Sequence, residues 1–489
     1  MLKTETAPMT INVLSSELKK ITTDWFQQNE TEITKGSTVN SPSELLAYER
    51  RLFLLLVQLG ALIIALVLKT RLQDKEFQRT TGEAFMKSCP KKYRHLKNYV
   101  TLVRTFFGNI VKVRTRYYVR KRDARRRSVG RNGTGVFPAL EALGIYHGVT
   151  PALGSDIARE VAEGPSMNAA RGRLERRGIF IDIKAIKRIC EAIGRMALDV
   201  RDRWLKSGGK SSNPLIPVGE TLRALRVLIG VDGGKSRIRT NKRGRIPEGY
   251  KRHGYTTDWR EPKILVIRAI DDAGKVLRDL SPVYDGTMAG ADAIFALLKA
   301  HLQARNIDEA LEIVCVCDGA VWIWERMGKM LLDLGVDPAK IHYAVDYFHA
   351  VEHLTAVADG KRCWSQKKRT RWLNGMKSLL IDGDIEAICD ELAELARGRN
   401  AKTAKREMQY FETNKERMRY NMLLERNLPI GSGATESAVR QIINMRLKGA
   451  GMFWLMENAE GLLHLRCYLK AGRWDAIENA VFANGIMVR

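Results

Sequence analysis

The chain has 489 residues, with 82 Lys and Arg against 55 Asp and Glu, and a formal net charge of +27. A hydrophobic content of 45% excludes a wholly disordered protein, and 28% charged residues argue against a polytopic membrane protein. The seven cysteines lack the spacing of a zinc finger or a disulfide scaffold, which favours a reducing cytoplasm. Nucleic acid is the commonest polyanion there, so the positive charge predicts a nucleic-acid partner.

Residues 1–95 predict a helical N-terminal region. Within it, residues 52–68 are almost entirely apolar and just reach the length of about 17–25 residues that a membrane span needs. Gln58 and Gly60 interrupt the run, and its leucines recur with a helical period. This pattern favours a buried helix, or one that takes part in oligomerisation, over a membrane helix, and we expect no membrane partner.

Residues 96–130 predict a basic β-hairpin, because apolar and cationic side chains alternate and Gly108-Asn109 supplies a turn. The cations would lie near one face of the hairpin and continue beyond it, in reach of DNA phosphates. The candidate DNA-binding residues of this segment are Arg114, Arg116, Arg120, Arg125 and Arg126.

Residues 131–205 predict short helices in a helix-turn-helix-like arrangement. Gly164-Pro165 breaks the helical pattern, and the basic helix from Ser166 to Arg177 would be the recognition helix, with Arg171 facing DNA. An ordinary helical bundle with a solvated basic face explains the same pattern and remains open.

Residues 206–214 are rich in Gly and Ser and predict a linker, after which the pattern becomes α/β. Strands are expected at 224–234, twice within 262–286, at 310–319 and at 340–350, with helices at 291–306 and 320–335. The predicted fold class is a mixed sheet covered by helices. The first part of this predicted domain is 225–350. An almost wholly helical, basic insertion follows at 351–429. The second part of the domain is 430–489, with a further helix at 433–448.

Acidic residues follow three of the expected strands. Asp232, Asp318 and Asp346 each stand where a strand ends, and Glu436 falls in the first or second turn of a later helix. Carboxylates at the carboxyl ends of neighbouring strands converge where α/β sheets bind ligands. Such sets suit Mg²⁺ or Mn²⁺, and a pair of ions supports in-line phosphoryl displacement. Each Asp before a Gly could instead simply stabilise a turn.

The motifs IVCVCDGAVWIW, AVDYFHAVEHL and PIGSGATESAVRQIINMRLKGAGMFW complete a recognisable pattern. Over about residues 225–470 the chain resembles bacterial insertion-sequence DDE transposases, whose ribonuclease-H-like catalytic domain carries an all-helical insertion before the Glu. The resemblance implies that Asp232, Asp318 and Glu436 bind two Mg²⁺ or Mn²⁺ ions. Asp346 and His349 match a D-x-x-H motif whose His lies near the scissile strand in related enzymes.

The family resemblance also implies that the helical insertion contacts transposon-end DNA. Relatives often carry a zinc-ribbon-like Cys pair after the basic hairpin; this chain does not, so no structural zinc is implied. Residues 361–377 contain seven Lys and Arg and no acid. Its candidate DNA-binding residues are Lys367, Lys368 and Arg369 for phosphates, and Trp364 and Trp372, on one helical face, for base stacking. Packing of both tryptophans inside the insertion is the alternative.

Residues 235–245 follow Asp232 directly and read as a mobile basic loop, with Lys235 and Arg237 gripping DNA beside the ions. His353 is expected to be structural, and Cys315 and Cys317 to be small core residues rather than ligands.

Together these features predict an enzyme, a transposase that cleaves transposon ends and transfers the strand into target DNA. Double-stranded DNA, as terminal inverted repeats and target, is the expected partner of a homodimer or a higher synaptic assembly in the cytoplasm, associated with the nucleoid. A structure-selective ribonuclease-H-like nuclease and a catalytically inactive DNA-binding repressor are the alternatives. The segment IGVDGGKSRIR also looks like the first phosphate loop of actin-like sugar kinases, but no second such loop follows.

Overall fold

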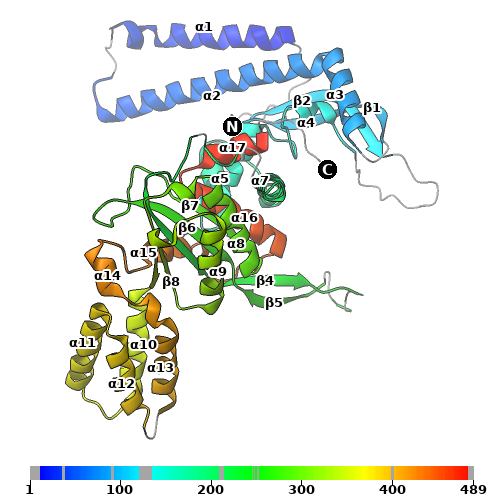
Figure 1. Cartoon of the computed structure of the whole chain (residues 1–489). Helices are drawn as coiled ribbons and strands as arrows, with labels where there is room; N and C mark the ends of the chain where they lie inside the picture. Colours follow the sequence, from blue (N-terminus) through cyan, green and yellow to red (C-terminus); the bar gives the residue numbers. More distant parts are fainter. Residues whose placement is uncertain are drawn as a thin grey trace. The chain divides into compact units, whose positions relative to one another are not determined.

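The computed structural model describes residues 11–35, 39–89, 93–120, 135–208, 214–217, 219–244, 246, 248–249, 253–397 and 401–482. The chain divides into two compact units, which are described separately. One comprises Met1–Met196 with Val481–Arg489, and the other comprises Ala197–Ala480. Figure 1 labels their helices and strands.

The first unit opens with three helices, as predicted. They are α1 (Ile11–Lys35), α2 (Pro42–Gln73) and α3 (Lys75–Ser88). Ser41 starts α2 because its side chain accepts from the Glu44 N–H, and Asp74 caps α3 in the same way. Leu68 and Leu72 pack into a core cluster.

Helix α2 is largely exposed in the single chain, so the buried role expected for it is wrong, while the expected role in oligomerisation stays a prediction. Phe53 is 57% exposed and Leu54 is 58% exposed. Many of the other apolar side chains in the first two-thirds of α2 are exposed too. By length and composition it is the one helix of the described chain that could cross a membrane, which for a single helix is weak evidence.

The predicted hairpin is confirmed as β1 (Tyr93–Arg104) and β2 (Ile110–Arg120), which pair antiparallel. The turn places Gly108 at φ 84°, in the left-handed region that favours glycine. Val111 and Val113 point into the core while Arg114 is exposed, so the alternation read from the sequence gives one buried and one basic face.

The predicted short helices follow as α4 (Pro138–Ala142), α5 (Pro151–Glu163) and α6 (Met167–Arg176), before the longer α7 (Ile183–Lys206). Ser166 caps α6 by accepting the Ala169 N–H (3.1 Å). The helix expected from Ser166 to Arg177 therefore exists with the expected start, and its role in DNA recognition stays a prediction.

The second unit is built on a five-stranded mixed sheet in the order β7-β6-β3-β8-β9. The strands are β3 (Arg226–Gly233), β6 (Lys263–Ile270), β7 (Val283–Thr287), β8 (Glu312–Cys317) and β9 (Ile341–Val345). β6 pairs antiparallel with β3 and β7, whereas β3, β8 and β9 run parallel. This confirms an α/β fold with a mixed sheet.

Between β3 and β6 the chain forms a separate hairpin of β4 (Ser236–Asn241) and β5 (Tyr255–Arg260) (Figure 1). The interpretation of residues 235–245 as a mobile loop was therefore wrong for most of the segment. Its alternating side chains bury Ser236 and Ile238, and the β4 backbone also bonds to Trp454.

Helices cover both faces of the sheet. Alternate residues of the strands pack against α8 (Ala291–Gln303) and α9 (Val321–Asp333) in one core cluster. The intervening residues pack against the helices of the predicted insertion in another. These are α10 (Tyr347–Gly360), α11 (Gln366–Asp382), α12 (Ile385–Leu395), α13 (Ala401–Asn414) and α14 (Tyr420–Glu425). Cys315 and Cys317 are core residues, as expected.

The last elements are α15 (Gly433–Val439), α16 (Met456–Lys470) and α17 (Trp474–Phe482). The helix expected at 433–448 is regular only in α15 and continues as a π-helical turn over Arg440–Asn444. The sheet connections also contain the 3₁₀ turns Ile307–Glu309 and Pro338–Lys340, and Lys415–Arg417 forms another before α14.

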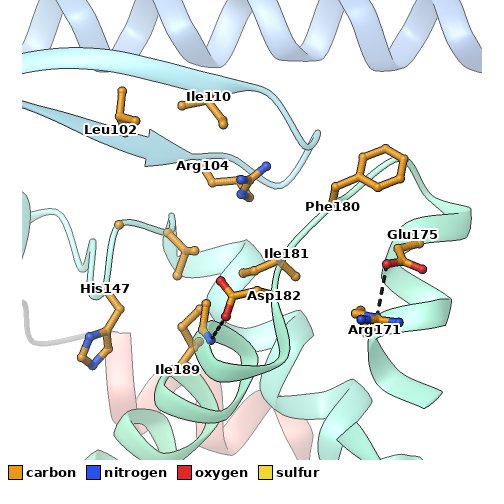
Figure 2. A pocket seen from close by; sticks show the side chains of 13 residues that line it. Leu102, Arg104, Ile110, His147, Arg171, Glu175, Phe180, Ile181, Asp182 and Ile189 are labelled. Atoms are coloured by element: carbon orange, nitrogen blue, oxygen red, sulfur yellow. Dashed lines mark hydrogen bonds and ion pairs between the residues drawn. The ribbon is translucent and has the colours of Figure 1, made fainter. Parts of the chain in front are cut away.

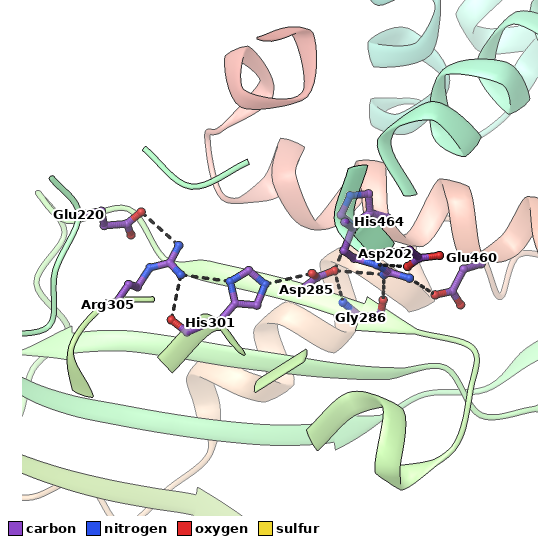
Figure 3. Close-up of polar contacts among 9 residues, drawn as sticks. Asp202, Glu220, Asp285, Gly286, His301, Arg305, Glu460 and His464 are labelled. Atoms are coloured by element: carbon purple, nitrogen blue, oxygen red, sulfur yellow. Dashed lines mark hydrogen bonds and ion pairs between the residues drawn. The ribbon is translucent and has the colours of Figure 1, made fainter. Parts of the chain in front are cut away.

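A buried polar network fastens α8 and α16 to the sheet edge (Figure 3). Asp285 of β7 bonds to His301 Nε2 (3.0 Å) through one carboxylate oxygen and to His464 Nδ1 (3.1 Å) through the other. Arg201 donates to the Gly286 carbonyl (3.0 Å) and pairs with Glu460 (2.8 Å). Burial alone would raise the pKa of Asp285. The cationic and hydrogen-bonding partners of this carboxylate instead hold its pKa well below its usual range.

Candidate acidic site and nucleic-acid surfaces

The three predicted strand aspartates come together at one edge of the sheet. The registers of β3 with β8 and of β8 with β9, extended past the ends of the paired segments, bring Asp232, Asp318 and Asp346 to one level. Neighbouring strands lie about 4.8 Å apart, so these residues are close neighbours. The Asp346 N–H donates to the Cys317 carbonyl (2.8 Å), which fixes that level between β8 and β9.

Asp232 and Asp318 are partly buried with few internal partners. Asp232 Oδ1 accepts the Gly233 N–H (2.6 Å), and Asp318 Oδ1 accepts the Ala320 N–H (3.0 Å). Burial raises the pKa of Asp232 to about 6, and the charge of Asp318 adds to the rise. Burial also raises the pKa of Asp318. Both carboxylates are therefore held in a site where their charges are under-compensated.

Asp346 is fully buried and has the opposite character. Its Oδ1 accepts the N–H groups of Phe348 (2.6 Å) and His349 (3.2 Å), and so caps α10. Its Oδ2 accepts from Ser432, through the backbone N–H (2.8 Å) and through the hydroxyl. Asp346 thus joins the start of α10 to the residue that precedes α15, which is the work of a positioning residue.

Glu436 stands on α15, whose place over the sheet depends on a close approach to Gly230 of β3. A Cβ on Gly230 would overlap with the Thr435 side chain. Glu436 is exposed, and its carboxylate lies with Asp346 and His349 in a group whose ligand atoms are all within 4.8 Å of one another. Among the described residues, the predicted set of Asp232, Asp318 and Glu436 does not meet that limit.

His349 is close to Asp346 and Glu436 and acts electrostatically on Asp232 and Asp318. Its charge opposes the rise that burial causes in the pKa of both Asp232 and Asp318. Its Nδ1 also pairs with Glu352 (3.3 Å), one turn further along α10. His353, by contrast, bonds to Glu407 (2.5 Å), in keeping with the structural role expected of it.

Glu261 is an acid near this site that the sequence analysis missed. It precedes β6, and its carboxylate bonds to Lys263 Nζ (2.7 Å). Its charge adds to the effect of burial on the pKa of Asp232 and Asp318. In the β3–β6 register Lys263 stands opposite Gly233, but the β4–β5 hairpin separates the two strands in sequence and conceals this proximity.

The donor set fits a hard divalent cation. Carboxylate oxygens are the ligands that Mg²⁺ and Mn²⁺ prefer, and a cation relieves the repulsion that crowded carboxylates impose on one another. Burial raises the pKa of Asp232 to about 6, and the charges of Asp318 and Glu261 add to that rise. Among the described residues, Asp346, His349 and Glu436 bring their ligand atoms close enough to share one ion, although both oxygens of Asp346 also accept hydrogen bonds from protein donors. Asp232 and Asp318 each accept one backbone N–H bond but lie outside that group.

Next to this site, the β4–β5 hairpin combines cations with exposed aromatic rings. The Arg237 guanidinium lies 5.1 Å from the ring centres of both Trp259 and Phe453, and Arg239 lies 5.7 Å from that of Tyr255. Lys235, at its base, is exposed. The predicted DNA-binding pair Lys235 and Arg237 thus belongs to a structured cationic and aromatic surface, typical of nucleic-acid contacts.

In the first unit, Arg114 and Arg120 are exposed and Arg116 is half-buried, while Arg125 and Arg126 lie outside the described residues. Arg171 of α6 lines a cavity of about 470 Å³ between the β1–β2 hairpin and helices α6 and α7 (Figure 2). Its Nε is 3.3 Å from Glu175, so this guanidinium is already paired within the protein.

In the insertion, Lys367 and Lys368 are exposed, whereas Arg369 donates to the Lys361 carbonyl (3.3 Å). Trp364 and Trp372 touch edge to face, with ring centres 5.6 Å apart, and Trp372 packs against the core. Trp372 therefore packs within the insertion, as the alternative interpretation expected. Trp364 precedes α11, which starts after the capping residue Ser365.

Comparison with protein-family models, with curated proteins and with solved structures finds no significant match in any of the three.

Proposed function

We propose that the protein is a DDE transposase with a ribonuclease-H-like catalytic domain. The observation that carries the proposal is the convergence of Asp232, Asp318 and Asp346 at one level of a parallel strand edge, with Glu436 and His349 beside them. Two of these carboxyls have raised pKa values because of burial, which suits a site that receives a divalent cation.

The topology supports the ribonuclease-H-like assignment. The sheet has three antiparallel strands followed by two parallel ones, with the first strand in the centre. The order of elements along the chain, with a helical insertion between the last strand and the Glu-bearing helix, agrees with the motif pattern of insertion-sequence transposases.

In the proposed reaction, water attacks phosphorus at the transposon end, and the P–O3′ bond breaks to leave a free 3′-hydroxyl. That hydroxyl then attacks a target phosphodiester, joins the transposon strand to it and releases the target's own 3′-hydroxyl. When bound, Mg²⁺ or Mn²⁺, as two ions, would stabilise charge on the attacking and leaving oxygens. Asp232, Asp318 and Glu436 would hold the ions, Asp346 would orient α10 and α15, and His349 would face the scissile strand.

The partner is double-stranded DNA, at terminal inverted repeats and at the target, bound by a dimer or higher assembly in the cytoplasm. The cations of the β1–β2 hairpin, the β4–β5 hairpin and the insertion supply the phosphate contacts. The net charge of +27 supports a partner that carries many negative charges.

The test is cleavage of DNA that carries the element's terminal repeats, with Mg²⁺ or Mn²⁺ present. We expect end-specific nicking by the wild type and, for Asp318→Asn, a loss of at least about 10²-fold, as when one group that stabilises a transition state is removed. Binding of the ends should not weaken. Asp292→Asn, which changes an exposed aspartate on α8, is the matched control and should cleave normally.

Other outcomes identify the alternatives. Cleavage without preference for the repeats indicates a structure-selective nuclease. Tight binding to the repeats without cleavage by the wild type indicates a repressor. Loss of both cleavage and binding in Asp318→Asn contradicts a purely catalytic role for that carboxylate.

A further inference from the structure

Tyr410 of α13 brings a phenol from the helical insertion to the acidic site. Among the residues that the structure describes, its hydroxyl has no hydrogen-bond partner although the oxygen is buried. An unsatisfied buried hydroxyl costs about 1–3 kcal/mol, so this phenol would gain from an acceptor that a bound ligand supplies.

A stacked histidine holds the ring of Tyr410. His353 of α10 stacks on it with a centroid distance of 3.7 Å and an interplanar angle of 20°. His353 is fixed in turn by its bond to the buried Glu407 (2.5 Å). Because His353 is anchored, the stack between α10 and α13 defines the direction of the phenol.

The phenol lies against the turn that carries Asp318. A Cβ on Gly319 would overlap with the ring of Tyr410 and stand 3.2 Å from its hydroxyl oxygen. Glycine at 319 therefore leaves the space that Tyr410 fills. The charges of Asp318 and Asp346 are close enough to add to the effect of burial in raising the pKa of Tyr410.

We propose that Tyr410 is a further catalytic residue, which donates its hydroxyl hydrogen bond to a non-bridging oxygen of the phosphodiester bound at the acidic site. The assignment rests on the proposed function. A phenol is a neutral donor at physiological pH, and phosphodiester oxygens are strong acceptors. The insertion then does more than bind DNA at a distance, since α13 supplies one group of the reacting site.

The first test is Tyr410→Phe in the full chain, with terminal-repeat DNA. We expect kcat to fall by about 10–100-fold while KM and the Kd for DNA stay unchanged, the pattern of an interaction made mainly in the transition state. Thermal unfolding should be unchanged or occur at higher temperature, because the lost hydroxyl has no partner within the protein. Tyr343→Phe, at a half-buried phenol of β9 to which the proposal gives no role, is the control.

Two further measurements separate donation to phosphate from a structural role. Gly319→Ala should lower kcat as Tyr410→Phe does, and the double variant should be no worse than either single one. Sulfur at one non-bridging oxygen should slow the wild type stereospecifically, and Tyr410→Phe should lose that stereospecific effect.

The outcomes that overturn the assignment are distinct. If the wild type cleaves and Tyr410→Phe cleaves equally well, the assignment is wrong and the proposed function stands. If Tyr410→Phe unfolds at a markedly lower temperature or raises KM alone, the hydroxyl is structural. If the wild type cleaves no DNA at all, the proposed function and this assignment both fail.

Discussion

Asp232 is well placed for the proposed ion site but unfavourable for the stability of the metal-free protein. Its carboxylate sits in a partly buried position beside Asp318, and its pKa of about 6, which follows from burial and then from its neighbours, measures how poorly the free site tolerates the negative charge. The chain keeps an acid there although a neutral residue would be better for stability.

Asp232→Asn should therefore stabilise the metal-free protein. At neutral pH we expect the free energy of unfolding to rise by about 1–3 kcal/mol, because one of two crowded charges is removed. The same variant should lose most of the stabilisation that Mn²⁺ gives the wild type. Thermal unfolding with and without Mn²⁺ measures both effects, and a variant less stable than the wild type in metal-free buffer contradicts the account.

At this scale the sequence predicted the acids better than their surroundings. Asp232, Asp318 and Asp346 were found because a strand-end acid is visible in one short segment. Glu261 and Tyr410 reach the site through contacts between segments distant in sequence, which no local pattern encodes. Trp364 and Trp372 lie eight residues apart, but Ser365 begins the helix between them, so they do not share a helical face.

The network at Asp285 is a property of elements, because it decides how α8 and α16 are attached to β7. Burial, with the charge of Arg305, lowers the pKa of His301 even though Asp285 opposes the change. A histidine whose pKa is lower in the folded state binds fewer protons there than when unfolded. Its contribution to stability is therefore present above the unfolded pKa of about 6.5 and is lost as the pH falls below it.

His301→Gln should consequently flatten the dependence of stability on pH. We expect the difference in unfolding free energy between wild type and variant to shrink as the pH falls from 7.5 to 5, by up to about 1.4 kcal/mol per pH unit. Urea unfolding across this range measures it. His253→Gln, at an exposed position, is the control, and an identical slope for His301→Gln and wild type would refute the argument.

Most elements were predictable from periodicity, and the exceptions have physical reasons. The strands β3, β6, β8 and β9 are continuous apolar runs, which only a sheet covered on both faces produces. The β4–β5 hairpin was missed because both strands are short and polar: β4 is basic with a single large apolar residue, Ile238, and β5 is exposed throughout. Helix α15 gives way to a π-helical turn that nothing in its composition signals.

For the whole molecule, the positive charge is distributed over several surfaces, and the proposed function predicts that each contributes a share of DNA affinity. Arg237 is held between Trp259 and Phe453, which limits the entropy that a phosphate contact would cost. We predict that Arg237→Ala lowers the slope of log K against log salt by about 1 and weakens binding to all sequences alike. Fluorescence anisotropy at several salt concentrations measures the slope.

Lys329→Ala removes an equal charge from α9 and is the control for this prediction. Its slope should match that of the wild type. Equal slopes for all three proteins would show that the β4–β5 hairpin contacts no phosphate.

The insertion is inseparable from the sheet at the level of the core. Leu228, Val314 and Val316 of the sheet share one hydrophobic cluster with α10–α14. This sharing could not be read from the sequence, where the insertion is set apart only by its basic composition.

The order of these elements along the chain has a consequence for synthesis. At about 5–20 residues/s, roughly 5–20 s pass on the ribosome between the emergence of β9 and that of α15. Throughout this interval Asp346 lacks Ser432, and the strand aspartates lack Glu436. A nascent chain interrupted within the insertion would thus carry the three strand aspartates and an incomplete site. The proposed cleavage activity would therefore require the helices that complete the core.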